Sequence, residues 1–259
     1  MQRLIDYSTR FPFVDLEGLL SHPKAKKPSD LHRILKSPQS EDWVTWNVLQ
    51  AIQRREPASW WPELVSLAKS HASALDDSLA YSSPPTIDLW RTVPTPCEYE
   101  RASRLRMESS DKAEWRKRAQ NSKPVEGPTE VDAVLKGDDY LIFVEAKLGS
   151  DVSEQTTYDP LRNQIVRNID CAIEHAGDRR PYFWMFVKDR RPKYRYSVII
   201  DRYRSDPRTL ETEMPHRNPE VLACIVRGIA MVEWRELSPL LPDTSELSDV
   251  LAELRQRVD

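Results

Sequence analysis

The chain has 259 residues, of which 31% are charged and 39% hydrophobic, and its formal net charge is −3. This length suits one domain with a sizeable core, and the small negative charge gives no overall attraction to nucleic acid. No apolar run approaches the roughly 20 residues of a membrane-spanning helix, and no signal peptide is recognised. The three cysteines (Cys97, Cys171 and Cys224) are far apart, so we expect no disulfide and a cytoplasmic protein without membrane partners.

The chain is expected to begin with an irregular arm, residues 1–39, that is rich in proline and basic residues. Ser40 then has the properties of a helix N-cap, with Glu41 and Asp42 in the first turn of a helix that runs to about Arg54. Negative side chains are favourable at this end of a helix.

Prolines punctuate the next part of the chain. Trp60-Trp61-Pro62 predicts the start of a second helix over about residues 62–75. Residues 88–93 are predicted to form a short strand that Pro94 stops, because proline cannot continue the ladder. Residues 100–120 are densely charged and predict one or two exposed helices.

Two stretches rich in β-forming residues flank Gly137-Asp138 and predict a hairpin over residues 130–147. With a two-residue turn, Lys136 would pair with Asp139, Phe143 would lie opposite Asp132, and Glu145 would lie opposite Glu130. A four-residue loop would keep the same side chains on each face, whereas a three-residue loop would separate the acids.

The two faces of this hairpin differ in chemistry because side chains alternate along a strand. Four polar side chains share one face: Glu130, Asp132, Glu145 and Lys147. The other face is almost wholly apolar: Val131, Ala133, Leu135, Tyr140, Ile142, Val144 and Ala146. A buried face opposite a face of clustered carboxylates is the arrangement expected of a metal site.

The remaining segments predict further helices and strands. They are a polar loop over residues 148–159, a helix over 160–175, a strand at 181–187 that is buried on both faces, a strand at 194–200, a helix at 219–228 capped by Asn218, and an amphipathic helix at 246–258.

The hairpin residues resemble the signature of the PD-(D/E)XK nuclease superfamily, which has an acid on one strand and (D/E)-x-K on the next. Asp132 matches the first acid and Glu145-Ala146-Lys147 matches the second motif, while Val131 stands in place of the proline. The resemblance implies hydrolysis of DNA phosphodiester bonds with Mg²⁺, for which Mn²⁺ would substitute.

The same resemblance implies an α/β fold with a mixed central sheet flanked by helices and a restriction-endonuclease-like αβββαβ core. That core would span residues 40–200, with elaborations at 54–85 and 97–126. Residues 201–259 would form a C-terminal extension of helices and strand packed on the core.

A carboxylate pair and a lysine suit this chemistry. Asp132 and Glu145 would hold the cation, and by resemblance the Ala146 carbonyl would add a ligand. Lys147 would orient or deprotonate the attacking water. The alternative for this face is an exposed salt bridge between Glu130 and Lys147, which would contribute little.

Two further side chains join the predicted site by resemblance. Glu41 would reach the metal, although an acid in a first turn also simply complements the helix dipole. Gln164 would help to hold the substrate or the catalytic lysine, and a bridged core amide is the alternative. Asn168, four residues on, falls in the apolar stripe and needs a partner. Glu130 would be an acid that supports the metal ligands, an alternative to Asp132 as the first acid, or a solvent-facing residue at the strand end.

Basic residues accumulate in residues 160–208, where twelve Lys and Arg face six Asp and Glu. Tyrosines alternate with them, which favours phosphate and base contacts by Arg190, Arg191, Lys193 and Arg195. A solvated charged surface is the commoner meaning of such a run.

The hairpin residues and their resemblance therefore predict a DNA nuclease, and the resemblance favours restriction, repair or phage defence in a prokaryote. The rival hypotheses are a catalytically inactive nucleic-acid-binding or assembly module with the same fold, and a nuclease subunit that depends on a partner ATPase. A homodimer would suit double-strand cleavage, because one site cuts one strand.

Overall fold

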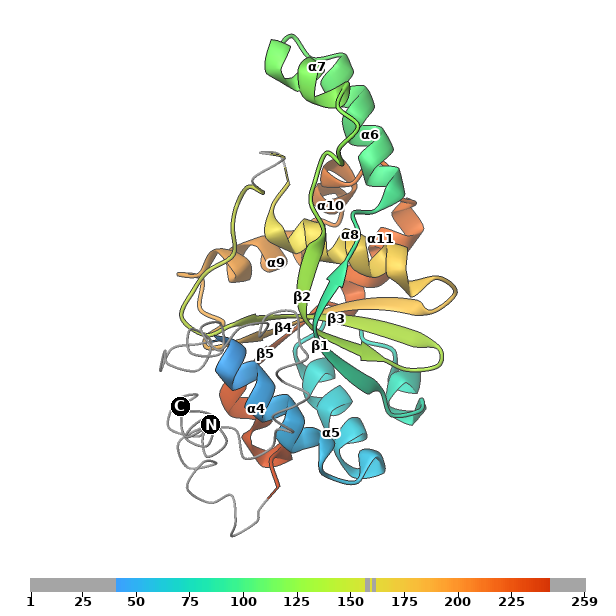
Figure 1. The fold of residues 1–259 in the computed structure, drawn as a ribbon. Helices are drawn as coiled ribbons and strands as arrows, with labels where there is room; N and C mark the ends of the chain where they lie inside the picture. Colours follow the sequence, from blue (N-terminus) through green and yellow to red (C-terminus); the bar gives the residue numbers. More distant parts are fainter. Residues whose placement is uncertain (1–40, 157–158, 160–161, 243–259) are drawn as a thin grey trace, which may run out of the picture.

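A five-stranded mixed sheet forms the centre of the molecule (Figure 1). The structure is a computed structural model that describes residues 41–156, 159 and 162–242. The predictions for the arm 1–39, for Ser40 and for the helix at 246–258 lie outside these residues. The α/β class with helices on both faces of a mixed sheet is confirmed.

The strands follow one another in space in the same order as in the sequence. They are β1 (Thr86–Val93), β2 (Thr129–Lys136), β3 (Tyr140–Lys147), β4 (Arg180–Val187) and β5 (Ala230–Glu233). The first three are antiparallel, and β3, β4 and β5 are parallel.

Helices cover both faces of this sheet (Figure 1). The α-helices of the described ranges are α4 (Glu41–Gln53), α5 (Pro57–Ser70), α6 (Cys97–Glu108), α7 (Ala113–Ala119), α8 (Gln164–Ala176), α9 (Arg195–Ser205), α10 (Arg208–Glu213) and α11 (Pro219–Gly228). Two 3₁₀ helices, η2 (Asp77–Tyr81) and η3 (Trp234–Leu240), complete them. One core joins α4, α5 and η3 to one face, and a second core joins α8, α9 and α11 to the other.

Strand β3 contributes to both cores and is buried along its whole length. Ile142 and Val144 pack in the core with α4 and α5, as predicted for the apolar face of the hairpin. Leu141 and Phe143 alternate with them and pack in the core with α8. The parallel neighbour β4 is buried on both faces too, which agrees with its continuous apolar run.

The hairpin pairing differs from the two-residue turn. Lys136 pairs with Leu141, and Phe143 lies opposite Val134 rather than Asp132. The Gly137 N–H donates to the Tyr140 carbonyl at 3.1 Å, so four residues separate the paired positions. Because the shift is two residues, residues 133–135 and 140–144 keep their predicted faces. The prediction for Val131 is wrong: it packs in the core with α8 rather than with Ala133 and Leu135, because the alternation of β2 changes at Asp132.

Strands β2 and β3 separate at the position of the predicted site. Their pairing ends at Ala133 and Val144, whereas β2 remains paired with β1 as far as Thr129. Trp90 of β1 lies level with Asp132 and has a φ of 51°, a conformation that is rare for a bulky residue. Its buried ring stacks on Trp46 of α4, with centroids 4.8 Å apart. This packing stabilises the unusual backbone conformation of Trp90.

Residues 194–200 were predicted as a strand, and this prediction is wrong because α9 covers most of them. The Asp151 carboxylate accepts backbone N–H bonds from Arg195 at 2.8 Å and from Tyr196 at 3.3 Å, which caps the helix from a distant loop. Tyr196, Ile200 and Tyr203 are then buried at helical spacing.

Two predicted helix starts are also wrong. Helix α5 begins at Pro57 rather than at Pro62, because Pro57 takes the first helical position that proline favours. Helix α8 begins at Gln164 rather than near residue 160, because the side chain of Asn163 accepts a hydrogen bond from the Val166 N–H. Helix α11 begins at Pro219 after the Asn218 cap, as predicted.

The two segments that the sequence placed outside the central core, residues 97–126 and 201–259, differ in their packing. Helices α6 and α7 form an arm that projects away from the sheet (Figure 1), in agreement with an exposed elaboration. Residues 201–242, by contrast, supply β5 to the sheet and η3 to one core, so this part of the chain is integral to the fold.

A buried ion cluster lies on the far side of α8 from the sheet. Asp170 is fully buried and accepts hydrogen bonds from Arg162 at 2.7 Å, Arg217 at 2.6 Å and His216 at 3.0 Å. Burial alone would raise the pKa of Asp170, but the His216 hydrogen bond and the Arg162 and Arg217 charges hold it well below its usual range.

The stability that Asp170 provides is therefore present above about pH 4, the unfolded pKa, and is lost as the pH falls towards the folded value. We expect Asp170→Asn to lower the free energy of unfolding by about 3 kcal/mol at pH 7, with a difference that narrows below about pH 4. Urea unfolding between pH 3 and pH 7 measures this. The exposed Asp178→Asn is the matched control, and a constant difference across the range would contradict the expectation.

Candidate functional site

The carboxyl end of β3 places Glu145 and Lys147 side by side beneath the start of α4. The Lys147 Nζ lies 2.6 Å from the Glu145 Oε1 and 3.9 Å from the Glu41 Oε1. Glu145 is 2% exposed and Lys147 is 7% exposed, so the pair is almost fully removed from water. Such a pair needs further hydrogen bonds to offset its desolvation.

Helix α8 supplies those hydrogen bonds. Gln164 Nε2 donates to Glu145 Oε1 and Asn168 Nδ2 donates to Glu145 Oε2, each at 2.6 Å. The two amides lie four residues apart and therefore on one side of the helix. Gln164 lies beside the predicted carboxylate, and its contact is with Glu145 rather than with Lys147. Asn168 finds the partner that its position in the apolar stripe required.

Asp132 reaches the same region from β2. Its Oδ2 accepts a hydrogen bond of 2.8 Å from the backbone N–H of Ala146, the residue between Glu145 and Lys147. This contact bridges the strands beyond the point where their ladder pairing ends. The predicted first acid and the E-x-K segment are thus in contact.

Glu41 points into the site and does more than complement the dipole of α4. Its Oε2 accepts hydrogen bonds from the Leu148 N–H at 2.8 Å and from the Ser150 Oγ at 2.7 Å. Both donors follow β3 directly, so Glu41 joins α4 to the chain that leaves the site. Glu130, in contrast, is exposed on β2 and pairs with Thr92 of β1.

Lys147 stays protonated in this environment. Burial alone would lower the pKa of Lys147, but the carboxylates of Glu145, Glu41 and Asp132 together raise it above its ordinary value. The ammonium therefore acts as a hydrogen-bond donor and a counter-charge, and of the two predicted roles this arrangement favours orienting a water over deprotonating it. Trp234 Nε1 fixes the backbone by donating to the Lys147 carbonyl at 3.2 Å.

The donor set has the chemistry of a magnesium site but an open geometry. Among the residues that the structure describes, no group of three or more His, Cys, Asp or Glu is placed to surround a metal ion. Asp132, Glu145 and Glu41 offer carboxylate oxygens, the donors that Mg²⁺ prefers, and Mg²⁺ usually takes only one or two of them and keeps several waters. The residues fit such a water-rich site.

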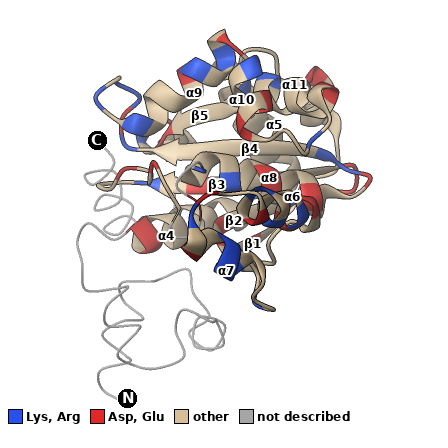
Figure 2. Ribbon diagram, turned by 90° about the horizontal axis from the view of Figure 1, so that it is seen from above, with Lys and Arg blue, Asp and Glu red and all other residues tan. Residues whose placement is uncertain are grey.

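Of the four predicted DNA-contacting residues, Arg190 is held by hydrogen bonds within the fold and the other three are exposed cations. Arg190 donates to both carboxylate oxygens of Glu236, at 2.7 and 3.0 Å, and to the Met231 carbonyl. The side chains of Arg191, Lys193 and Arg195 are 71%, 53% and 57% exposed. Figure 2 shows basic residues along α9 and the turn before it.

Several residues that hold the site in place were not predicted from the sequence. Asp151 caps α9, Ser150 binds Glu41, and Ser153 exchanges hydrogen bonds with Gln164 through its backbone N–H and carbonyl. All three lie in the loop after β3, whose polar composition marks it as a loop without indicating partners. The Asn163 cap was the one detectable signal, because asparagine favours that position.

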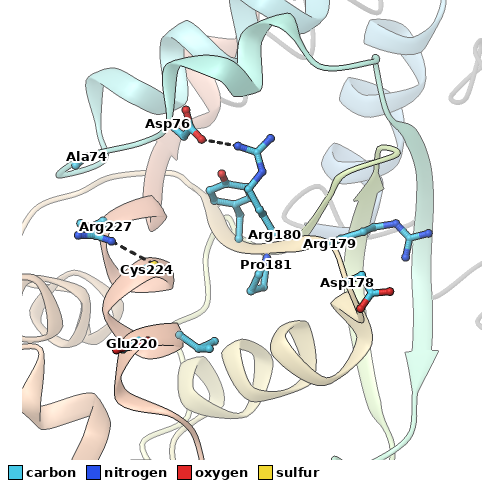
Figure 3. A pocket seen from close by; sticks show the side chains of 11 residues that line it. Ala74, Asp76, Asp178, Arg179, Arg180, Pro181, Glu220, Cys224 and Arg227 are labelled. Carbon is cyan, nitrogen blue, oxygen red and sulfur yellow. Dashed lines mark hydrogen bonds and ion pairs between the residues drawn. The ribbon is translucent and has the colours of Figure 1, made fainter.

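A pocket of about 500 Å³ lies at the amino-terminal end of β4, away from the carboxylate site (Figure 3). Arg180 begins β4 and is ion-paired there with Asp76, while Arg227 donates to the Cys224 Sγ at 3.2 Å. The pairing of β3 with β4 places Arg180 seven residues from the level of Lys147, about 23 Å along the strand. This pocket is separate from the carboxylate site.

The buried Glu145–Lys147 pair predicts strongly coupled mutations. Glu145→Gln and Lys147→Met should each lower the free energy of unfolding by about 3 kcal/mol, because each leaves the other charge buried without its partner. The free energy of unfolding of the double variant should fall by less than the sum of the two single losses, and the difference should be roughly 1–3 kcal/mol. Urea unfolding of the four proteins measures the coupling. Lys136→Met, at an exposed position of β2, is the control, and additive losses would contradict the prediction.

In the basic segment, residues 190–195, we expect Arg190 to contribute to folding stability and the three exposed cations to contribute to DNA binding. Arg190→Ala should lower the free energy of unfolding by about 1–3 kcal/mol, since Glu236 loses its two hydrogen bonds from the guanidinium. Replacing Arg191, Lys193 and Arg195 together by alanine should change stability by about 0.5 kcal/mol at most for each residue. If they contact phosphates, the triple variant should flatten the log–log salt dependence of DNA binding by about 0.9 per lost contact. Fluorescence anisotropy across a salt series measures this, and an unchanged slope would remove them from the DNA surface.

In the described part of the chain, no helix is both long and apolar enough to cross a membrane. No protein-family model matches this chain, no curated protein is similar to it in sequence, and no solved structure matches it. The relation to the PD-(D/E)XK superfamily therefore remains a resemblance of a few residues, and the function has to be inferred from the geometry of the site.

Proposed function

We propose that this chain is a metal-dependent nuclease that hydrolyses phosphodiester bonds of DNA. One observation carries the proposal: the buried ammonium of Lys147 contacts Glu145 and lies 3.9 Å from Glu41, while Asp132 accepts the Ala146 N–H between the two strand residues. The group lies where the pairing of β2 and β3 ends, and its Glu145 and Lys147 side chains are almost fully buried.

The order of the elements supports the proposal. Helix α4 precedes three antiparallel strands, and α8 then leads to the parallel strand β4. This is the αβββαβ order that the resemblance implies for a restriction-endonuclease-like core. In that order the acid of the second strand and the E-x-K of the third meet, as Asp132 and the Ala146 backbone do here.

Asp132 and Glu145 would hold the cation, with water filling its remaining positions. When bound, Mg²⁺ would generate a nucleophilic hydroxide near neutral pH and neutralise charge on the leaving oxygen. Gln164 and Asn168 would keep the Glu145 carboxylate in one orientation, because each holds one of its oxygens. Glu41 would orient the chain that follows β3.

Lys147 would act as a donor in this reaction. Its raised pKa keeps it charged, so it would donate a hydrogen bond to the attacking water or to a phosphate oxygen. Charge neutralisation by a fixed ammonium requires no reorganisation at the moment of reaction.

A non-catalytic nucleic-acid-binding module is the second candidate. One contact favours it, because the 2.6 Å contact between Lys147 and Glu145 occupies a carboxylate oxygen that a metal would need. In this case the pair would be structural, and the basic residues near α9 would carry the function.

Cleavage of labelled single-stranded and double-stranded DNA by the purified full chain distinguishes the candidates. We expect cleavage with Mg²⁺ or Mn²⁺ that EDTA abolishes. Asp132→Asn should reduce the rate by at least about 100-fold, since an amide is a poorer ligand but still accepts the Ala146 hydrogen bond. Asn168→Ala should reduce it by about 10–100-fold.

The control is Asp88→Asn, an exposed position of the neighbouring strand β1 that should leave the rate unchanged. Metal-dependent cleavage that survives Asp132→Asn would refute the assigned site. DNA binding without cleavage under any of these metal conditions would favour the non-catalytic module.

A further inference from the structure

A second pocket shares the loop that follows β3 with the carboxylate site. It has a volume of about 410 Å³ and is formed by this loop, the turn before α9, the exposed side of α9, and α10. The same loop contacts the site through Ser150 and Ser153, and it contacts α9 through Asp151. Asn163, at the wall of the pocket, directly precedes Gln164 of the site.

The pocket has an apolar patch that is open to solvent. Pro192, Val198 and Ile199 line it together. Val198 is 52% exposed, and it is one of only three large hydrophobic residues exposed in the described part of the chain. An exposed valine between arginines of one helix needs a reason, because a solvent-facing helix position is ordinarily polar.

Cations surround this patch. Arg195, Val198 and Arg202 follow one another at helical spacing on α9, and Lys193 precedes them in the turn. Each cation has an acidic neighbour: Arg195 lies 3.3 Å from Glu154, Arg202 lies 2.9 Å from Glu213, and Lys193 lies 3.5 Å from Asp189. The three cationic side chains are at least half exposed, and such ion pairs are weak enough to exchange for a phosphate.

The inner wall of the pocket is polar and ordered. The Glu213 carboxylate accepts hydrogen bonds from Asn163 at 3.1 Å, from Tyr203 at 2.6 Å and from Arg202 at 2.9 Å. Asn163 Nδ2 also donates to the Tyr203 hydroxyl at 2.8 Å, so its N–H groups are engaged within the wall. The Glu213 carboxylate fixed in this way presents hydrogen-bond acceptors of the kind that an amino group on the edge of a nucleobase would bind.

Building on the proposed function, we propose that this pocket binds one unpaired nucleotide of a single-stranded segment beside the scissile bond. The base would cover Val198 and Pro192, and its phosphates would lie on Lys193, Arg195 and Arg202. A duplex hides the faces of its bases in the stack, so the apolar patch would gain nothing from paired DNA. The substrate class is therefore DNA with an unpaired strand.

The test uses the full chain in EDTA, so that binding is measured without cleavage. Fluorescence anisotropy compares a labelled 12-nucleotide single strand, the same strand with abasic sites throughout, and the corresponding duplex. We expect the normal strand to bind at least about fivefold more tightly than the abasic strand, because both carry the same phosphates and only one carries bases.

Val198→Asp should reduce that preference for bases to less than about twofold, because it places a negative charge at the apolar patch. The matched control is Arg208→Gln, which makes the same change in net charge at an exposed position of α10 outside the pocket. It should keep the preference. Arg202→Gln should weaken both strands alike and flatten the salt dependence by about 0.7 per lost phosphate.

Equal binding of normal and abasic strands by the wild type would overturn the proposal, whatever the variants do. A preference for bases that survives Val198→Asp would overturn it as well. These results are independent of cleavage. Base-dependent binding without cleavage would support the nucleotide pocket and refute the nuclease proposal. Metal-dependent cleavage with equal binding of normal and abasic strands would support the nuclease proposal and refute the nucleotide pocket.

Discussion

The removal of the Glu145 carboxylate from water is the constraint on which the site depends. A buried charge of this kind persists only when ion pairs and hydrogen bonds offset its desolvation. Lys147, Gln164 and Asn168 supply them, and through these contacts the carboxylate connects β3 to α8. Lys147 also faces Glu41 and so links the same strand to α4. The Glu145–Lys147 pair thus links β3 to both helical layers that enclose the sheet.

The parts of the fold that follow from local chemistry were predictable from the sequence. The apolar run of β4 and the Asn218-Pro219 start of α11 depend on neighbouring residues alone, and both agree with the structure. Residues 194–200 favour a strand locally because of their tyrosines, valine and isoleucines. Their helix depends on Asp151, more than 40 residues earlier in the chain, and a local pattern cannot contain that contact.

The candidate site shows the same division. The common side of Glu145 and Lys147 follows from the two-residue period of strands, which the longer hairpin loop leaves unchanged. Asp132 meets this segment through the Ala146 N–H, at the point where the alternation of β2 breaks. The loop length itself depends on the chain before β1, because Ser83 binds Asp138 through its hydroxyl and the Tyr140 hydroxyl through its carbonyl, each at 2.8 Å. The anchoring of Arg190 was unpredictable for a similar reason, since Glu236 lies 46 residues further along the chain.

The anchored Arg190 changes how the adjacent turn can take part in recognition. A flexible basic loop loses conformational freedom when it binds a polyanion, at roughly 0.5–1.5 kcal/mol for each ordered long side chain. Here Glu236 holds the start of the turn, and Asp151 fixes its end at the first residues of α9. Lys193 and Arg195 are therefore presented from a backbone that is already ordered, and only their side-chain tips have to be immobilised. The turn is preorganised, so a polyanion that binds it would meet cations at fixed positions, and the turn would not have to rearrange around the ligand.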